Sequence, residues 1–485
     1  MGKKKLLIIA TAIAAFTFKA ASENLALPDT TELLLSYIEN DSELKNLTIA
    51  AKKAALSYDS TRIDKGFDIT LASGTINIEL SDDNTKVSAK PSVQAKLPQA
   101  SNLSAEVSTK IDSSDNQKVS DTSISLGIDI ISSSNLTNKI SLLKAKRSVI
   151  EAERKLEKRV LNAEKEFYSE LKQLLSSINS IMKSEEQLYS DTIDFEAVKV
   201  QGFSTVSSTY RKAQLKVITD QHDIESSLHS FIHDCVVFYK KCGFDIQIDE
   251  KTDLMTLVPT DIEYITTLNI TDFDKSLYNA IESAEWTYKI NSMERKANKN
   301  YSLSANAGYT IDNSATNSDS VDAGLTGTLG GLKLGAGVSL PVNQNEDSAN
   351  SKSSSPAIKL SLSLNPNTFR KNSITKKQNA LTEEQELLAI QAAESDYETT
   401  IVEHHQKLDT LLWDKKTCQE NLSLYEELEK DMAQLFKQGF ISESDYLSTK
   451  TTLNSCIIKK VMNQIDLIIY NDDVAANFVR NTDGE

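Results

Sequence analysis

Four cysteines are the side chains best suited to covalent chemistry in this 485-residue chain. Cys418 and Cys456 lie 19 residues on either side of residue 437, so an antiparallel helical hairpin that turns there would place them at the same height. In an oxidising compartment they could form a disulfide, and otherwise both would be buried free thiols. Cys235 and Cys242 are seven residues apart, about 10 Å along a continuous helix, so they could form a disulfide only if the helix breaks before Gly243.

The histidines and the known catalytic motifs add no enzymatic signal. His229 and His233 share one helix face, and His404 adjoins His405, but metal binding would need further ligands. We interpret all four as residues of a packed core or of a lumen. The sequence has no phosphate-binding glycine loop, no HExxH zinc motif and no nucleophile elbow. We therefore expect no enzymatic activity, no cofactor and no resident metal.

The composition excludes several other classes of protein. Basic residues number 53 and acidic residues 69, which gives a formal net charge of −16 and a pI near 5.0. Nucleic-acid binding requires a basic surface that neutralises phosphates, so we expect no nucleic-acid partner. At 39% hydrophobic residues the chain is too apolar to be disordered throughout and too polar for a bundle of membrane-spanning helices.

The N-terminus has the order of a secretory signal peptide. Three lysines at positions 3–5 precede an apolar run from Leu6 to Phe18, and the small residues Ala20-Ala21-Ser22 follow. The apolar run is about 13 residues long, which is too short for a helix that spans roughly 30 Å of hydrocarbon. A retained single-span anchor is the alternative. We predict a signal peptide over residues 1–22.

The remainder of the chain contains one pattern twice. Each half begins with a helical stretch, which starts at Thr31 in the first half and near Asp272 in the second. A region of alternating apolar and polar residues follows, over about residues 67–131 and 301–365, and this alternation predicts strands with one apolar face. Each region contains about four such runs, of which one is Ile124, Leu126, Ile128 and Ile130.

Each strand region leads into a long helical hairpin, over about residues 136–240 and 368–470. Apolar residues recur every three or four positions in the first of them, at Val160, Ala163, Phe167, Leu171, Leu174, Ile178, Ile181 and Leu188. This spacing is typical of the seam of a helical bundle or coiled coil. Helices of such length need packing partners along most of their course.

Both hairpins reverse direction at a similar sequence. The first turn reads Gln201-Gly202-Phe203-Ser204 and the second reads Gln438-Gly439-Phe440-Ile441. A glycine suits the left-handed position that ends a helix, and a serine or aspartate shortly afterwards suits the N-cap of the next helix. We therefore place the tips of the hairpins at residues 201–208 and 438–446.

The duplicated pattern resembles the TolC-like outer-membrane efflux protein family, the channel-tunnels. The resemblance covers nearly the whole mature chain, and its most specific residues are Gly202-Phe203, Gly439-Phe440 and the run Ser444-Asp445-Tyr446-Leu447. It implies an α+β fold, mainly α, made of two structural repeats. Each repeat would contain a helix, a β region, a long helix and a return helix.

The same resemblance gives the boundaries of the parts. The first repeat would span residues 23–242 and the second repeat residues 272–472. An inter-repeat equatorial segment would occupy residues 243–271, and a C-terminal tail would occupy residues 473–485.

The resemblance also implies an assembly. Strands from three copies of the chain would close one 12-stranded transmembrane β-barrel in the outer membrane, and the helices would form an α-helical barrel, the periplasmic tunnel. The implied partners are outer-membrane lipid, a periplasmic adaptor (membrane fusion protein) and an inner-membrane pump. The family contributes two strands per half, whereas about four alternating runs occur in each half of this chain.

Within such an assembly, Gly202, Phe203, Gly439 and Phe440 would form the tips on which the adaptor docks. Glycine would supply the turn conformation, and each phenylalanine would pack under neighbouring helices or into the adaptor. A purely structural turn is the alternative.

Three residues near the tips are candidates for the pore or its gate. Glu443 and Asp445 would form acidic rings in a trimer, which select cations or close the tip through hydrogen bonds. Ser208 stands where the family carries an acidic residue in the first repeat. Asp445 could equally be a helix cap.

We predict from these features an outer-membrane channel-tunnel, a passive exit duct of a tripartite efflux or type I secretion system for small molecules or protein. The alternative from another class is a periplasmic coiled-coil adaptor or scaffold protein with a β-sandwich head that never enters a membrane. An adaptor would show one helical hairpin flanked by β segments, so the duplication favours the duct. The tight antiparallel turns disfavour a third possibility, a surface adhesin.

Overall fold

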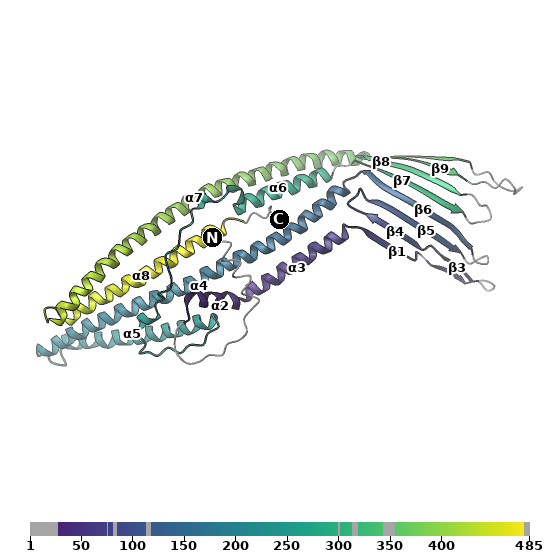
Figure 1. Ribbon diagram of the computed structural model, residues 1–485. Coiled ribbons are helices and arrows are strands. Elements are labelled where there is room, and N and C mark those ends of the chain that lie inside the picture. Colours follow the sequence, from purple (N-terminus) through teal and green to yellow (C-terminus); the bar gives the residue numbers. More distant parts are fainter. Residues whose placement is uncertain are drawn as a thin grey trace. The chain divides into compact units, whose positions relative to one another are not determined.

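The computed structural model describes residues 28–74, 76–80, 85–112, 118–298, 301–312, 319–342 and 355–479 (Figure 1). The predicted signal peptide and the end of the predicted C-terminal tail lie outside the described residues. The chain divides into two compact units, which we name the helical unit and the sheet unit. The helical unit comprises Met1–Ile49, Arg154–Asn279 and Ser395–Glu485, and the sheet unit comprises Ala50–Glu153 and Ala280–Glu394.

Long helices dominate the chain. Three helices lie in the helical unit only, together with three 3-10 turns: α2 (Thr30–Asn40), α5 (Ser208–Lys241), α8 (Glu443–Ala476), η1 (Leu254–Leu257), η2 (Ile270–Asp272) and η3 (Lys275–Leu277). Four more helices have residues in both units: α3 (Ser42–Asp64), α4 (Ser134–Val200), α6 (Asn279–Ala297) and α7 (Pro366–Lys437). No glycine or proline interrupts α4, and the one proline of α7 is its first residue, where the missing N–H costs nothing.

The sheet unit contains one antiparallel sheet of ten described strands. The first repeat supplies β1 (Asp68–Ala72), β2 (Asn77–Leu80), β3 (Thr85–Ala89), β4 (Ser92–Leu97), β5 (Leu103–Asp112) and β6 (Lys118–Ile131). The second repeat supplies β7 (Tyr301–Asp312), β8 (Ser320–Leu329), β9 (Leu332–Pro341) and β10 (Ala357–Leu364). The strand order is β1-β4-β5-β6-β7-β8-β9-β10, and β6 pairs with β7 to join the two repeats.

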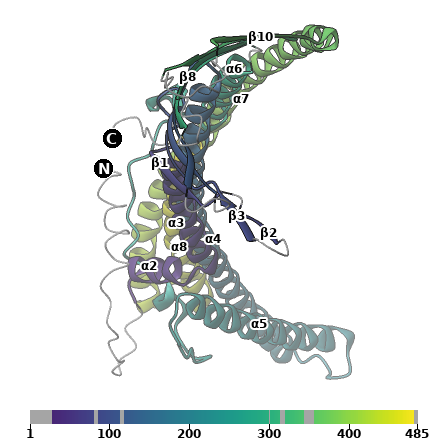
Figure 2. The same cartoon turned by 90° about the vertical axis from the view of Figure 1, so that its right-hand side faces the viewer.

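The ten strands form eight strand lines. A line is either a single strand or two consecutive strands that lie end to end along the same neighbouring line. β3 and β4 both pair with β5, and between them the backbone N–H of Thr109 donates to the carbonyl of Pro91 at 3.0 Å. β2 pairs with β3 (Figure 2), and β1 pairs with β4. Each half supplies four lines, as its four alternating runs indicated. The two strands per half that the resemblance implied are therefore wrong for this chain.

The core of the helical unit lies where α4, α5 and α8 meet the segment between the repeats. Phe167 of α4 is fully buried, and its ring centroid lies 5.3 Å from that of Phe238 of α5. Ile465 of α8 is fully buried in the same cluster. Asp261 accepts hydrogen bonds at 2.8 Å from both the backbone N–H and the hydroxyl of Thr30, which attaches the start of α2 to the inter-repeat segment.

A smaller core holds the helices of the sheet unit together. α4 and α6 contribute the apolar cluster of Ile140, Ile290, Ala297, Leu136, Leu143, Trp286 and Met293. Next to it the side chain of Arg147 is 6% exposed, and its Nη2 donates to Oε2 of Glu282 at 2.9 Å. The same guanidinium lies 4.9 Å from the centre of the Trp286 ring. Arg295 of α6 pairs with Glu386 of α7 at 2.8 Å, so ion pairs connect α6 to both of its neighbours.

Arg147→Ala should lower the free energy of unfolding of the sheet unit by about 2 kcal/mol, because it leaves the carboxylate of Glu282 without its buried partner. Lys146→Ala removes an exposed neighbour of the same charge and should change the free energy of unfolding by less than about 0.5 kcal/mol. Urea denaturation followed by Trp286 fluorescence in a Trp413→Phe background would measure both. Equal effects of the two variants would contradict a structural role for the Arg147 ion pair.

Candidate functional site

One face of the sheet is apolar from β1 to β10. Along one row of the register Leu71 is opposite Val93, and Val93 is opposite Val107. Val107 is in turn opposite Ile124, and other rows repeat this arrangement. Most of the large aliphatic residues on this face are exposed, and the exposed ones include Ile69, Leu71, Val93, Leu103, Val107, Ile124, Leu126, Ile128, Val321, Leu325, Leu334, Val338, Leu340, Ile358, Leu360, Leu362 and Leu364. Such a continuous exposed apolar face indicates contact with an apolar medium or partner.

The opposite face of the same sheet is polar. One row across the strands consists of Lys96, Ser104, Gly127, Asn306, Gly324, Gly337 and Lys359. Adjacent rows carry acidic side chains, among them Glu106 and Asp322, and many hydroxyls. A sheet with one apolar and one polar face suits a boundary between an apolar medium and water.

The two ends of the sheet are open. Among the described strands, β1 pairs only with β4 and β10 pairs only with β9. Every residue of β1 and β10 is exposed. An edge strand of this kind presents unpaired backbone N–H and C=O groups, which are a template for pairing with another chain.

The first hairpin tip joins α4 to α5. Gly202 has a φ of +76°, and its N–H donates to the carbonyl of Lys199 at 3.0 Å. Ser207 caps α5, because its side chain accepts a hydrogen bond from the backbone N–H of Tyr210. Phe203 is 42% exposed, so the tip displays an aromatic ring to its surroundings.

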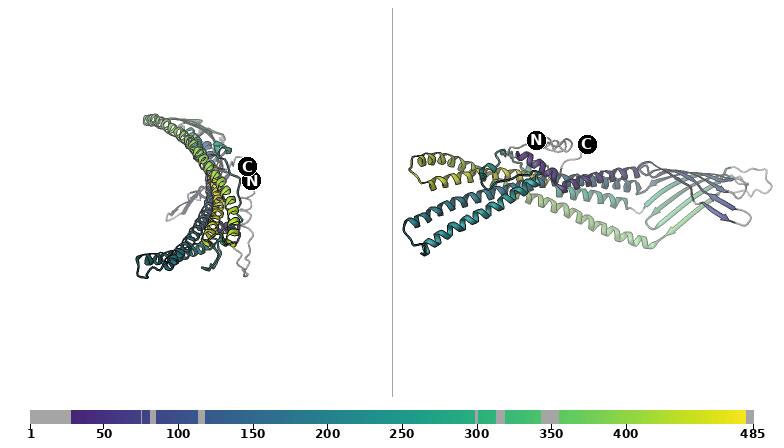
Figure 3. Two further views of the ribbon diagram at one scale, coloured as in Figure 1. Left: turned by 90° about the vertical axis from the view of Figure 1, so that its left-hand side faces the viewer. Right: turned by 90° about the horizontal axis from the view of Figure 1, so that it is seen from below.

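The second tip joins α7 to α8 with the same reversal. Gly439 has a φ of +75°, and the N–H of Phe440 donates to the carbonyl of Leu435 at 2.9 Å, which closes a Schellman motif. Phe440 is 73% exposed. The right view of Figure 3 shows both hairpins as paired helices that end in these turns. Each tip therefore has a glycine of positive φ followed by an accessible phenylalanine, but seven residues separate the helices at the first tip and five at the second.

The structure gives the three gate candidates different surroundings. Asp445 forms a capping box with Ser442, whose hydroxyl donates to its carboxylate at 2.6 Å. Ser208 is the first residue of α5 and follows the N-cap. Glu443 hydrogen-bonds to Tyr189 of α4 and raises the pKa of that hydroxyl. Glu443 thus connects the second hairpin to the first near their tips, a link that no sequence motif indicated.

A second polar cluster that the sequence did not indicate joins α4 to α5 near the first tip. Asp191 is 4% exposed and accepts hydrogen bonds from Lys216 and from Gln187. Burial alone would raise the pKa of Asp191, but these partners and the neighbouring Asp220 lower it. The hydrogen bond to Asp191 raises the pKa of Asp220, so Asp220 is the member of the pair that takes up a proton first as the pH falls.

Cys418 and Cys456 lie side by side on α7 and α8, but they are free thiols. The Sγ of Cys418 is 3.9 Å from the carbonyl oxygen of Cys456 and is directed at the backbone. Burial raises the pKa of both thiols above 9.0, which disfavours the thiolate through which disulfides form. The possible disulfide is therefore not formed in this structure. Cys235 and Cys242 are also free and buried.

The other side chains that could take part in catalysis or metal binding are dispersed over the chain. The Nε2 of His404 accepts a hydrogen bond from the side-chain amide N–H of Asn477, and the Nε2 of His405 donates one to the side-chain oxygen of Asn269, both within the helical unit. Across the described ranges, no three or more His, Cys, Asp and Glu side chains are grouped so that they could hold a metal ion. None of the described helices combines the length and the apolar composition needed to cross a bilayer.

The two halves of the chain match two family models. Residues 33–262 match the TP096X N-terminal domain, and residues 265–481 match the TP096X C-terminal domain. The chain therefore carries both domains of the TP096X family, in that order. The junction of the two domains falls inside the segment 243–271 that separates the predicted repeats. No curated protein matches the sequence.

Several solved structures are similar to this chain along nearly its whole length. The open state of the MtrE outer membrane channel of Neisseria gonorrhoeae is 12% identical, with a TM-score of 0.45, and covers 96% of this chain and 95% of its own. The outer membrane protein VceC of Vibrio cholerae is 11% identical, with a TM-score of 0.44 and coverages of 92% and 94%. The CmeC outer membrane channel of Campylobacter jejuni is 12% identical, with a TM-score of 0.42 and coverages of 97% and 96%.

The helical unit should respond to acid through Asp473. Burial alone would raise the pKa of Asp473, but Lys165 of α4 and Lys407 of α7, each 2.7 Å away, lower it below 3.8. Because the folded pKa is depressed, the stabilisation is complete above 3.8 and is lost as the pH falls through the folded value. Asp473→Asn should lower the free energy of unfolding by about 1 kcal/mol at neutral pH, and the difference should shrink in acid.

Denaturant titrations at neutral pH and below pH 3.8 would measure this dependence. Asp431→Asn changes an exposed carboxylate of α7 in the same way and serves as the control. A difference between wild type and Asp473→Asn that persisted undiminished in acid would rule out the ion pairs as its source.

Proposed function

We propose that this protein is an outer-membrane channel-tunnel, the passive exit duct of a tripartite efflux or type I secretion system. The observation that carries the proposal is the sheet, with an exposed apolar face, a polar opposite face and two open edges. Lipid would cover the apolar face, and water would fill the lumen on the polar face. The apolar residues of β9, from Leu332 to Leu340, extend over about 27 Å, close to the height of the hydrocarbon band that such barrels present.

Closure would come from further copies of the chain. β10 of one copy can pair with β1 of the next, because both edges are exposed and unpaired among the described strands. Such a head-to-tail contact produces a closed ring when the rotation from one copy to the next is a whole fraction of a full turn. With three copies, eight strand lines per copy would give about 24 lines, and a barrel of that size is wider than one of 12 strands. The homotrimer is part of the proposal.

The hairpin tips would meet the periplasmic adaptor. Phe203 and Phe440 are exposed aromatic residues that each follow a glycine of positive φ, and aromatic anchors of this kind dominate protein interfaces. Glu443, Asp445 and Ser208 would lie near the mouth of the tunnel, where repeated carboxylates favour cations. The energy for transport would come from an inner-membrane pump that the adaptor connects to the duct.

Fractionation and electrical recording test the duct directly. The native protein should be extracted by detergent from the outer membrane as a homotrimer, seen by native mass spectrometry, and should conduct ions in planar lipid bilayers. Recovery of a soluble periplasmic monomer that leaves bilayers silent would contradict the duct and favour an adaptor or scaffold.

The tips are tested by the double variant Phe203→Ser and Phe440→Ser. It should retain its bilayer conductance but lose roughly tenfold or more in pull-down of the adaptor and in transport by cells, since two buried anchors would be removed. Leu424→Ser, which removes an exposed apolar side chain of α7 away from the tip, is the matched control and should behave as wild type. Transport that survives the double variant unchanged would exclude these rings from docking.

A further inference from the structure

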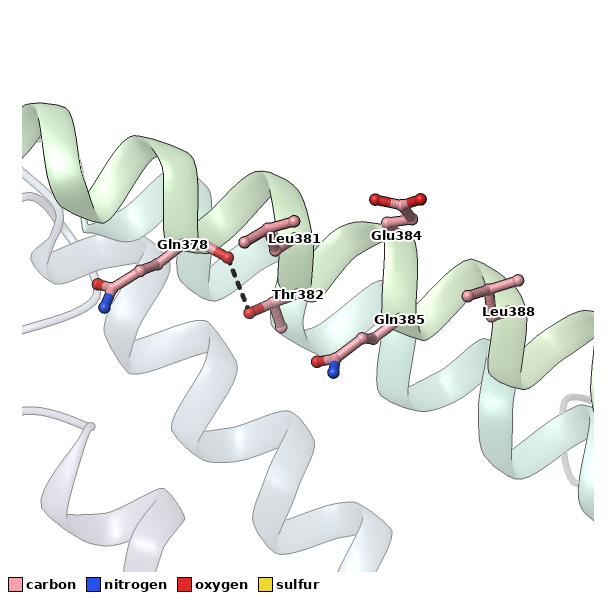
Figure 4. Close-up of a pocket in the computed structure, with 6 residues that line it drawn as sticks. All are labelled: Gln378, Leu381, Thr382, Glu384, Gln385 and Leu388. Carbon is pink, nitrogen blue, oxygen red and sulfur yellow. Dashed lines mark hydrogen bonds between the residues drawn. The ribbon is translucent and has the colours of Figure 1, made fainter.

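Two helices of this chain carry exposed apolar stripes at a spacing of seven residues. On α3 the stripe consists of Ile49, Leu56 and Ile63, which are 52%, 69% and 73% exposed. On α7 it includes Leu381 and Leu388, which are 62% and 57% exposed and project from the helix beside Glu384 in Figure 4. Ile374 begins this second stripe and is 58% exposed. Apolar residues repeated every seven positions are the pattern of a helix that packs along a partner helix.

The packing of α4 on α6 shows which partner would fit. α4 descends from the end of β6, α6 ascends to the start of β7, and their cluster contains Ile140 and Ile290. Ile140 lies nine residues after β6, and Ile290 lies 11 residues before β7. These two helices flank the junction of the two repeats, where β6 pairs with β7.

The same elements recur at the open edges of the sheet. α7 descends from β10, and α3 ascends to β1. Ile374 lies ten residues after β10, and Leu56 lies 12 residues before β1, so both correspond within one residue to the packed pair Ile140 and Ile290. The junction between copies would therefore repeat the junction inside one copy.

We propose that α3 of one copy packs antiparallel along α7 of the neighbouring copy, with Leu56 opposite Ile374 and Ile49 opposite Leu381. The proposal rests on the ring of copies in the proposed function and adds its helical interface. The stripe of α3 is one residue wide, that of α7 is widened only at Leu387 beside Leu388, and both stripes have charged neighbours, which suits a single helix rather than a lipid surface.

The charges beside the two stripes support this register. In this antiparallel register, the numbers of two residues that face one another add to about 430, as they do for Leu56 and Ile374. On one flank of the pair, Asp59 meets Arg370 and Lys45 meets Glu384. Lys52 and Lys377 meet between these pairs, and their long side chains reach solvent, where like charges are separated at small cost. The other flank places Ser60 beside Lys371, Lys53 beside Gln378 and Asn46 beside Gln385. Of the three pairs in which both side chains are charged, two combine opposite charges and one, Lys52 with Lys377, combines like charges.

Engineered disulfides test this pairing in the full-length protein. The double variant Leu56→Cys and Ile374→Cys, extracted from outer membranes and oxidised with copper phenanthroline, should give a non-reducing ladder that ends at three linked chains. Each single variant and the wild type report any linkage through the native cysteines and should give none. The control pair Ile63→Cys and Leu381→Cys is mismatched in height by about 21 Å and should not cross-link.

The outcomes separate this inference from the function on which it rests. A ladder confined to the matched pair supports it. A conducting trimer whose matched pair does not cross-link, or cross-links no better than the mismatched pair, overturns the helix pairing and leaves the duct intact. A monomer that does not conduct overturns both.

Discussion

The exposed apolar face of the sheet is the constraint on which the rest of the structure depends. A large and continuous apolar face is unfavourable in water, so the fold is complete only when something apolar covers it. Its opposite face is polar in every row, which excludes burial of both faces in a protein core. The open edges add a second demand, since their backbone groups need partners wherever water is absent. A ring of copies in lipid satisfies both demands together.

The duplication places equivalent helices in unlike surroundings. At the junction inside the chain, Arg147 of α4 pairs with Glu282 of α6 beside a small apolar cluster. Counted from the adjacent strand ends, the position of Arg147 corresponds within one residue to Leu381 of α7. A buried ion pair requires defined partners within one chain, whereas an apolar stripe tolerates exposure before assembly at moderate cost. This difference between α4 and α7 is consistent with an α7 stripe that is covered only when the copies assemble.

The two hairpins share a glycine–phenylalanine pattern but differ in the length of the turn and in its neighbours. Both contain a glycine with positive φ before an exposed phenylalanine, but the second also has the capping box of Ser442 and Asp445. In the first hairpin, the ion pair between Asp191 of α4 and Lys216 of α5 joins the two helices instead. Glu443 joins the second hairpin to Tyr189 of the first. The two tips are therefore similar in backbone and different in electrostatics, and rings formed by three copies would alternate between two kinds of tip.

Features that depend on local periodicity could be predicted from the amino-acid sequence. Alternation in runs such as Ile124 to Ile130 specified strands with one apolar face, and uninterrupted three- and four-residue spacing specified α4 and α7, because side-chain direction follows directly from backbone geometry. Glycine at 202 and 439 specified the turns. Which distant residues come into contact could be seen only in the folded chain. The order of the eight strand lines, the link between Tyr189 and Glu443, and the thiol of Cys418 directed at a carbonyl all depend on register and rotation between elements, which no single segment encodes.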